Sequence, residues 1–332
     1  MAIDGILVVA KPIGPTSHDV VALVRRLAGT KRVGHGGTLD PFASGVLPLF
    51  LGRATRMLEY HLGDGKSYRA TVCFGATSTT DDLEGELTPS GTAPTRSAVE
   101  AALAAFTGTL TQVPPAYSAI KIGGRRAYAL ARAGERPVLA PRTITVSQLV
   151  LVDWDASDPE RPVAVLDLEC SAGTYVRALA RDLGAALGSA AYLGALSRTA
   201  SGGFRLEAAH DLEAIRAAAA DGSLERLVLP PDVGLEAIPA LTLSPEEVAD
   251  LARGQLISPI DRGGQDGRSG GPVRVLDESG RLVAIAVWRS GRLAPEKVLI
   301  EAPARRPAEA ELRAERDPVA GVDADPATPD DL

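Results

Sequence analysis

The amino-acid sequence predicts an α+β protein with a large domain over residues 1–235 and a small, mostly β domain over residues 236–301. Strand and helix patterns are interspersed through the first part of the chain. The second part holds one helix pattern and two strand patterns. Residues 302–332 are rich in Ala, Pro, Glu and Asp, and hold too little apolar surface to fold alone. We therefore expect a disordered acidic tail after the second domain.

The chain opens with a strand, a turn and a helix. Residues 5–9 read Gly-Ile-Leu-Val-Val and predict a buried strand, and residues 11–16 predict a turn because two prolines and a glycine interrupt regular structure. Ser17 is the expected N-cap of a helix whose apolar side runs from Val20 to Leu27. A glycine-rich polar loop over residues 33–41 separates this helix from an apolar stretch over residues 45–51.

The remaining elements are predicted from the 3.6-residue period of apolar residues in helices and their 2-residue period in strands. In the large domain, strands are predicted over residues 67–75, 144–154 and 163–170, and helices over residues 95–106 and 173–187. In the small domain, a helix is predicted over residues 245–253, and strands over 273–277 and 282–288 are joined by a turn at 278–280. Residues 261–272 are glycine-rich, so a mobile loop is expected there.

Composition places the chain among soluble globular proteins of a reducing compartment. Of 332 residues, 45% are apolar and 23% charged, which leaves ample material for a core. Cys73 and Cys170 are far apart in apolar runs, which suits buried thiols better than a disulfide or a metal site. We expect no metal and no membrane span, and a cytoplasmic location, because neither a signal peptide nor a long apolar stretch is present.

Charge is distributed unevenly. The net charge of -7 argues at first against a polyanionic partner, but residues 301–332 hold nine acidic and four basic residues and so account for -5 of it. Residues 1–56 hold seven Lys and Arg against three acidic residues. Residues 114–142 hold six basic residues against Glu135 alone: Lys121, Arg125, Arg126, Arg132, Arg136 and Arg142. Such patches are compatible with nucleic-acid binding or with plain solvated faces.

The segment Gly34-His35-Gly36-Gly37-Thr38-Leu39-Asp40-Pro41 is the most unusual in the sequence. Three glycines permit close approach of a bulky ligand, and the proline after Asp40 favours an extended backbone that fixes the direction of the carboxylate. A tight surface turn remains the plain alternative. The spacing does not fit a dinucleotide-binding fingerprint.

Five segments in collinear order, between about residues 3 and 205, resemble the motifs of bacterial TruB-type tRNA pseudouridine synthases, which act on uridine 55 of the T-loop. They are residues 5–19, with Lys11-Pro12; residues 33–48, with Asp40; Lys66-Ser67-Tyr68; residues 114–121; and residues 170–177, which end at Arg177. Leu196-Ser197-Arg198 resembles a further motif, although a frequent pair of basic residues is replaced there. The residues after about 236 are similar, less specifically, to the PUA RNA-binding module.

The resemblance implies a mixed, largely antiparallel sheet in the large domain, a PUA-like β domain after it, and a basic RNA-binding insertion at about residues 114–142. It implies that the protein isomerises a uridine in the T-arm of tRNA as a monomer, without a cofactor and without a role for DNA. Recognition would then depend on loop shape, stacking and backbone contacts.

By the same resemblance, three residues are assigned to catalysis. Asp40 would be the catalytic carboxylate, Arg177 would pair with it, and Tyr68 would pack against the uracil and relay the proton that leaves C5. A core tyrosine and a surface helix charge are the plain alternatives for Tyr68 and Arg177. Whether Asp40 attacks the sugar, attacks the base or takes a proton from the sugar is left open.

The remaining candidates are assigned to substrate binding. His35 would hold the flipped-out nucleotide, Lys11 would support the loop, and Asp82 would line the site. The other candidates come from the matched motifs and the basic insertion: Gly36, Leu196, Lys121, Arg125, Arg126 and Arg132. A satisfied polar histidine, a solvated turn and an acidic solvated loop are the plain alternatives for the first three.

Two other functions remain possible for such a sequence. A nucleoside or glycoside hydrolase would also place a carboxylate beside a sugar, but such enzymes usually need two carboxylates flanking one bond. An RNA-binding or tRNA-folding protein would need the basic regions but not Asp40, Tyr68 and Arg177 together.

Overall fold

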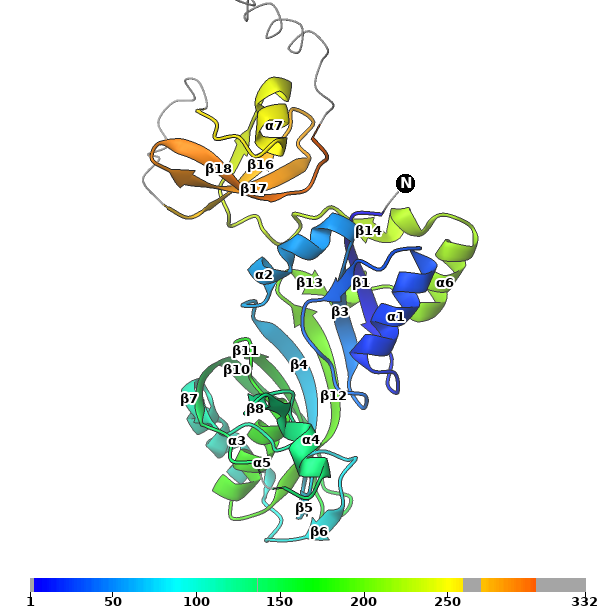
Figure 1. Ribbon diagram of the computed structural model, residues 1–332. Coiled ribbons are helices and arrows are strands. Elements are labelled where there is room, and N and C mark those ends of the chain that lie inside the picture. The colour runs from blue at the N-terminus through cyan, green and yellow to red at the C-terminus, as the bar shows by residue number, and fades with distance from the viewer. Residues whose placement is uncertain (1–2, 136, 259–269, 303–332) are drawn as a thin grey trace, which may run out of the picture. The chain divides into compact units, whose positions relative to one another are not determined.

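The computed structural model describes residues 3–135, 137–258 and 270–302 (Figure 1). The chain divides into two compact units, residues 1–239 and residues 240–332. Most of the predicted loop at 261–272, Arg136 and the predicted tail from residue 303 onward lie outside the described residues. In the part of the chain that the structure describes, no helix is long and apolar enough to cross a membrane.

The first unit is organised around a ten-stranded mixed sheet with the main order β14-β1-β3-β12-β4-β11-β10-β7, to which β2 and β13 add at β3 and β12. Among the strand pairings of the described residues in this sheet, only that of β12 with β3 is parallel, so the predicted mixed, largely antiparallel sheet is confirmed. The strands are β1 (Gly5–Lys11), β2 (Val33–His35), β3 (Ser44–Leu51), β4 (Lys66–Phe74), β7 (Gly108–Gln112), β10 (Arg142–Asp155), β11 (Val163–Cys170), β12 (Ala191–Ser201), β13 (Phe204–Arg205) and β14 (Val228–Leu229).

Helices and hairpins surround this sheet. In Figure 1, α1 and α6 lie beside β1, and α3 and α5 lie near the β10–β11 end. The helices are α1 (Ser17–Leu27), α2 (Leu58–His61), α3 (Arg96–Ala102), α4 (Ala127–Arg132), α5 (Val176–Ala186) and α6 (Leu212–Ala220), with 3-10 turns at Gly52–Met57, Leu103–Phe106, Leu206–Ala208 and Leu224–Leu227. The two hairpins pair β5 (Ala76–Ser78) with β6 (Leu87–Pro89) and β8 (Lys121–Ile122) with β9 (Arg125–Arg126).

The core of the first unit includes the face of the sheet on which α5 packs. Leu179 and Leu183 of α5 are buried together with Val72 of β4 and Leu166 of β11. These positions follow the 3.6-residue period of the helix and the 2-residue period of the strands. The packing fixes α5, and with it Arg177, against β4 and β12.

The second unit contains the small β domain. Its sheet has the order β15-β16-β17-β18, formed by β15 (Ala240–Thr242), β16 (Pro272–Leu276), β17 (Leu282–Arg289) and β18 (Arg292–Val298). Helix α7 (Pro245–Ala252) begins after Ser244, whose side chain forms a capping box with Glu247. Leu251 of α7 and Val283 of β17 belong to one small core. The turn at 278–280 contains Gly280 at φ +81°, a value that favours glycine.

Two predicted helix starts are wrong. Thr16 rather than Ser17 caps α1, because the Thr16 hydroxyl accepts from the Asp19 N–H while the Asp19 carboxylate accepts from the Thr16 N–H. Helix α5 begins at Val176 rather than at Gly173, since Gly173 has φ +82° and Tyr175 is extended. The predicted loop at 33–41 also contains the short strand β2.

Candidate active site

Asp40 lies in the loop between β2 and β3, and the backbone on both sides of it is tied to the start of α1. The Gly14 N–H donates to the Pro41 carbonyl at 2.9 Å. The Ser17 hydroxyl accepts from the Leu39 N–H at 2.9 Å and donates to the Leu39 carbonyl at 3.0 Å. These contacts leave the Asp40 backbone little freedom, so the direction of its carboxylate is set by the fold.

Arg198 of β12 holds the loop that carries Asp40 through the carbonyls of that loop. Its guanidinium is buried and donates from Nε to the Val46 carbonyl at 2.7 Å, from Nη2 to Gly37 O at 3.1 Å and from Nη1 to Thr38 O at 3.4 Å. In the sequence, Arg198 stands in the matched motif Leu196-Ser197-Arg198, with no role of its own predicted. It is the single charged residue of residues 191–201, and a charge buried in such a segment must find internal partners.

Tyr68 of β4 faces Arg198 in the sheet register. The side chains of Tyr68 and Arg198 are both buried. Burial raises the pKa of Tyr68, while the Arg198 charge acts in the opposite direction. Arg198 therefore holds the loop that carries Asp40 and places its charge near Tyr68.

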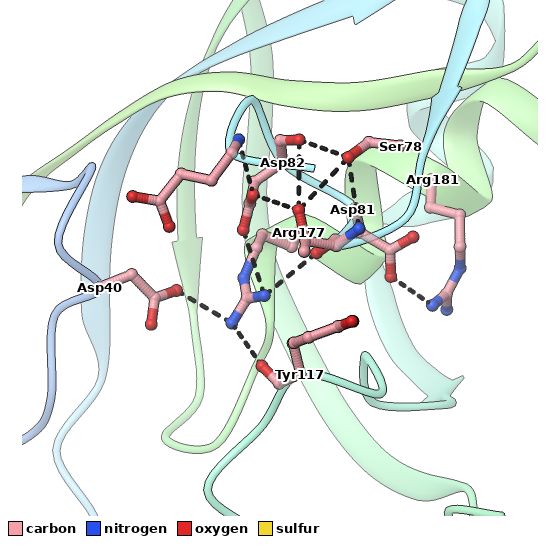
Figure 2. A network of polar contacts seen from close by, with 9 residues as sticks. Asp40, Ser78, Asp81, Asp82, Tyr117, Arg177 and Arg181 are labelled. Carbon is pink, nitrogen blue, oxygen red and sulfur yellow. Dashed lines mark hydrogen bonds and ion pairs between the residues drawn. The ribbon is translucent and has the colours of Figure 1, made fainter. Parts of the chain in front are cut away.

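Figure 2 shows Arg177 at the centre of a polar network. Its Nη2 lies 3.0 Å from the Asp40 Oδ2, and its Nη1 lies 3.2 Å from the Asp82 Oδ2. Nη1 also donates to the Thr80 carbonyl at 3.1 Å, and Nη2 to the Tyr117 carbonyl at 3.0 Å. Arg177 is thus a buried residue that links α5 to three other segments of the chain, and not a surface helix charge.

The two carboxylates of this network differ in exposure. The Asp40 side chain is 37% exposed, whereas the Asp82 side chain is 4% exposed and the Arg177 side chain 7%. Thr80 Oγ1 and the Glu84 N–H also donate to Asp82 Oδ1. Asp82 is therefore fully engaged within the protein, whereas Asp40 keeps a partly exposed carboxylate and forms an ion pair with Arg177.

His35 and Gly36 lie on the same loop as Asp40. His35 Nδ1 accepts from the Gly37 N–H at 3.3 Å, and the ring meets His18 edge-on at 5.5 Å between centroids. Burial, followed by the His18 and Arg198 charges, lowers the pKa of His35, so its ring is neutral at neutral pH. Gly36 is buried, and a Cβ there would lie 3.3 Å from the Phe50 ring.

Lys11 and Leu196 face inward. The Lys11 ammonium is buried and donates to the carbonyls of Pro12 at 2.8 Å and Pro15 at 2.9 Å, so it braces its own turn. Burial lowers the pKa of Lys11, and the negative charge of Asp40 opposes this shift. Leu196 is half-buried and packs against the core of the first unit. Neither residue is fully open to a ligand.

The predicted basic insertion forms the β8–β9 hairpin and helix α4. Its four candidate residues are exposed: Lys121, Arg125, Arg126 and Arg132. Arg125 pairs with Glu135 at 2.9 Å, and the Arg132 guanidinium lies 5.8 Å from the Tyr128 ring centroid. The insertion meets the network of Figure 2 at its root, through the Tyr117 carbonyl.

Sequence comparison identifies the family. Residues 25–176 match the model of the TruB family pseudouridylate synthase N-terminal domain, residues 177–236 that of the tRNA pseudouridylate synthase B C-terminal domain, and residues 239–299 that of the pseudouridine synthase II TruB C-terminal domain. A tRNA pseudouridine synthase B of Bradyrhizobium diazoefficiens is 45% identical over 306 residues, which cover 89% of this chain and 86% of that protein. The chain belongs to the TruB family of pseudouridine synthases. A second TruB relative, from Leifsonia xyli, is 43% identical over 86% of this chain and 93% of its own length.

Solved structures are similar to this TruB chain over most of its length. A chain in the crystal structure of a Cbf5-Nop10-Gar1 complex is 25% identical, with a TM-score of 0.68 over 91% of this chain and 86% of that chain. A chain in the archaeal box H/ACA sRNP Nop10-Cbf5 complex gives a TM-score of 0.67 at the same identity. The likeness agrees with the α+β fold described above.

Proposed function

We propose that this chain converts a uridine of tRNA to pseudouridine, at position 55 of the T-loop, with Asp40 as the catalytic carboxylate. The observation that carries the proposal is the half-open Asp40 carboxylate, held by the buried Arg177 at 3.0 Å. The relatives named tRNA pseudouridine synthase B supply the substrate class. We assign catalysis to residues 1–235 and RNA binding to the insertion and to residues 236–301, with the enzyme acting as a cytoplasmic monomer on the T-arm.

The reaction sets a short list of chemical needs. The bond between the ribose C1′ and N1 of uracil breaks, the base turns, and a bond forms between C1′ and C5. The C5 proton then leaves to a base, and N1 receives a proton. One carboxylate at the sugar and one proton acceptor near C5 are sufficient. Asp40 is assigned the first role, and Tyr68, which is buried opposite Arg198 in the sheet, is assigned the second.

The burial and the hydrogen bonds of Asp82 argue against a hydrolase. Glycoside hydrolysis usually needs a second carboxyl group that is free to act as acid or base. Asp82 is 4% exposed, and its oxygens are engaged by Arg177, Thr80 and Glu84. The site therefore presents one available carboxylate, which suits an isomerisation.

The proposal is tested by incubating unmodified tRNA with the protein and mapping pseudouridine chemically along the strand. A single modified position in the T-loop, unchanged tRNA mass and no free uracil are expected. Release of uracil would indicate a hydrolase. Binding without any change of the tRNA would leave only an RNA-binding or RNA-folding role.

Tyr68→Phe is expected to lower the single-turnover rate by about 10²-fold or more, because general acid–base groups contribute that much, while tRNA affinity stays within about twofold. The ring remains in place between its neighbours, but the hydroxyl near the Arg198 charge is removed. Rapid-quench measurement at saturating enzyme checks the rate. A rate near that of the wild type would reduce Tyr68 to a packing role.

Replacing Arg125, Arg126 and Arg132 together with Gln is expected to weaken tRNA binding and flatten its salt dependence. Each lost phosphate contact should lower the slope of log affinity against log salt by roughly 0.7 to 0.9. Turnover by saturated enzyme should change little, since none of these exposed residues touches Asp40 or Tyr68 among the described contacts. Filter binding over a range of salt concentrations measures the slope. An unchanged slope would remove the insertion from the RNA interface.

A further inference from the structure

Helix α5 carries a second arginine, Arg181, one turn after Arg177. Like Arg177, it contacts the loop at residues 80–82 and the root of the basic insertion. Arg181 Nη1 lies 2.9 Å from the Asp81 Oδ2, and Nη2 donates to the Val113 carbonyl at 2.9 Å. Its Nε bonds the neighbouring Asp182 at 2.9 Å. Figure 2 shows Asp81 turned toward Arg181 while Asp82 turns toward Arg177.

Asp81 occupies an unusual backbone conformation. Its φ is +61°, in the left-handed region that residues other than glycine visit rarely, although Asp and Asn tolerate it best. Its N–H donates to the Ser78 carbonyl at 3.2 Å, and its carbonyl accepts from the Leu193 N–H at 3.0 Å. This turn separates two adjacent acidic side chains and sends them to two different arginines.

Val113 stands at the root of the basic insertion, four residues before Tyr117. Arg181 therefore fixes the chain just before the insertion, and Arg177 fixes it just inside. The same two side chains bind the loop at residues 80–82 through Asp81, Asp82 and the Thr80 carbonyl. Besides Asp40, Arg177 contacts the loop at residues 80–82 and the root of the insertion at Tyr117. Arg181 binds each of these two segments at a second residue, Asp81 in the first and Val113 in the second.

We propose that Arg181 and Asp81 form a positioning pair for the reaction at Asp40. The pair fixes the left-handed turn before Asp82 and the root of the insertion before Tyr117. It thereby sets where Arg177 presents its Nη2 to the Asp40 carboxylate. This inference rests on the proposed function of Asp40 and deepens it, because it names a residue that acts through Arg177 and touches no substrate.

The environment of the pair distinguishes it from an ordinary surface ion pair. The Asp81 side chain is 17% exposed and the Arg181 side chain 32%, whereas the surface pair Arg96–Glu100 is 56% and 48% exposed. Burial raises the pKa of Asp81, and the charges of Arg181 and Arg177 oppose that shift, with Asp182 acting against them. A shielded pair at a strained turn loses geometry when one partner is removed, while exposed pairs contribute little.

The experiment compares Arg181→Met, Asp81→Asn and the double variant with the wild type. Met keeps the aliphatic stem of Arg181, and Asn keeps the shape of Asp81 and tolerates its positive φ. Single-turnover rates at saturating tRNA should fall by about 10-fold to 100-fold, the effect of misplacing a reacting group by about an ångström. Affinity for tRNA and its salt slope should stay within about twofold. The double variant should be no slower than the slower single variant, because both lose one interaction.

Two controls separate positioning from loss of folding. Asp182→Asn removes the other carboxylate beside Arg181 but leaves its contacts with Asp81 and Val113, so its rate should match the wild type. Arg181→Lys keeps the charge but has one nitrogen for the contacts that three nitrogens make, so an intermediate rate is expected. Thermal unfolding measured in parallel ensures that all rates refer to folded protein.

Hydrogen exchange provides a readout that does not depend on turnover. Arg181→Met should increase exchange in residues 78–85 and 113–117 and leave the strands β4 and β11 unchanged. Wild-type rates and unchanged exchange in the Arg181 and Asp81 variants would overturn the inference. A wild-type protein that makes no pseudouridine would instead refute the proposed function, and the exchange result would still report whether the pair holds the two segments.

Discussion

Asp40→Asn is expected to bind tRNA with wild-type affinity and to form pseudouridine at a rate lower by about 10⁴-fold or more, the usual loss when a reacting group is removed. The amide keeps the shape of the carboxylate and can still accept from Arg177 Nη2, so the loop should not move. What it lacks is the negative oxygen that the chemistry uses. The Arg177–Asp82 pair is not changed in Asp40→Asn, so a difference in rate between this variant and the wild type reports the loss of the Asp40 charge.

The measurement is single-turnover formation of pseudouridine, together with tRNA affinity by filter binding. Glu100→Gln is the matched control, because it removes an exposed carboxylate that pairs with Arg96 at 2.9 Å on α3. That variant should keep full activity. Substantial turnover by Asp40→Asn would refute Asp40 as the catalytic carboxylate and direct attention to Tyr68.

Local patterns in the sequence were sufficient for the elements whose periodicity is strong. The strand over residues 163–170 has the predicted bounds, and α1 ends at Leu27, the last residue of the predicted apolar side, because alternation and a single apolar side determine these positions. Strand β12 was not predicted as a strand. It pairs with β4 on one side and with β3 on the other, so its small and apolar residues reflect neighbours that are distant in sequence.

The site likewise has residues that the sequence motifs predicted and contacts that only the structure shows. The motif resemblance assigned Asp40, Tyr68 and Arg177 together, and the structure brings Asp40 and Arg177 to 3.0 Å and pairs Tyr68 in the sheet with Arg198, which holds the Asp40 loop. The sequence could not show that Asp82 and Asp81 serve different arginines. That distinction depends on the φ of +61° at Asp81, and no propensity predicts a left-handed aspartate at one position of an acidic run.

Arg198 and Lys11 illustrate a second limit. Both are almost fully buried, and each donates to backbone carbonyls, with no carboxylate among the hydrogen-bond partners that the structure describes for them. The sequence predicted that Lys11 would support the loop, with a solvated turn as the alternative, and gave Arg198 no role of its own. Only the three-dimensional arrangement of carbonyls at residues 12, 15, 37, 38 and 46 shows that these cations hold the backbone.

Arg177→Met should cost both stability and activity, for reasons that can be separated. Removing the guanidinium leaves the Asp82 carboxylate, 4% exposed, without its cation at 3.2 Å. Breaking a buried pair in this way typically lowers the free energy of unfolding by about 3–5 kcal/mol. The Asp40 carboxylate loses its ion pair with Arg177, so turnover should fall by about 10²-fold or more.

The double variant Arg177→Met/Asp82→Asn separates the two effects. The Asn amide carries no charge, and its oxygen can still accept from the Glu84 N–H as Asp82 does at 3.0 Å, so part of the lost stability should return. Activity should not return, because the partner of Asp40 is still absent. Urea unfolding and single-turnover rates measure the two quantities, and Arg96→Met, which breaks an exposed pair, is the matched control. Recovery of turnover together with stability would mean that Arg177 only supports the fold, and the orientation of Asp40 would then have to come from Ser17, Gly14 and Arg198 through the backbone of its loop.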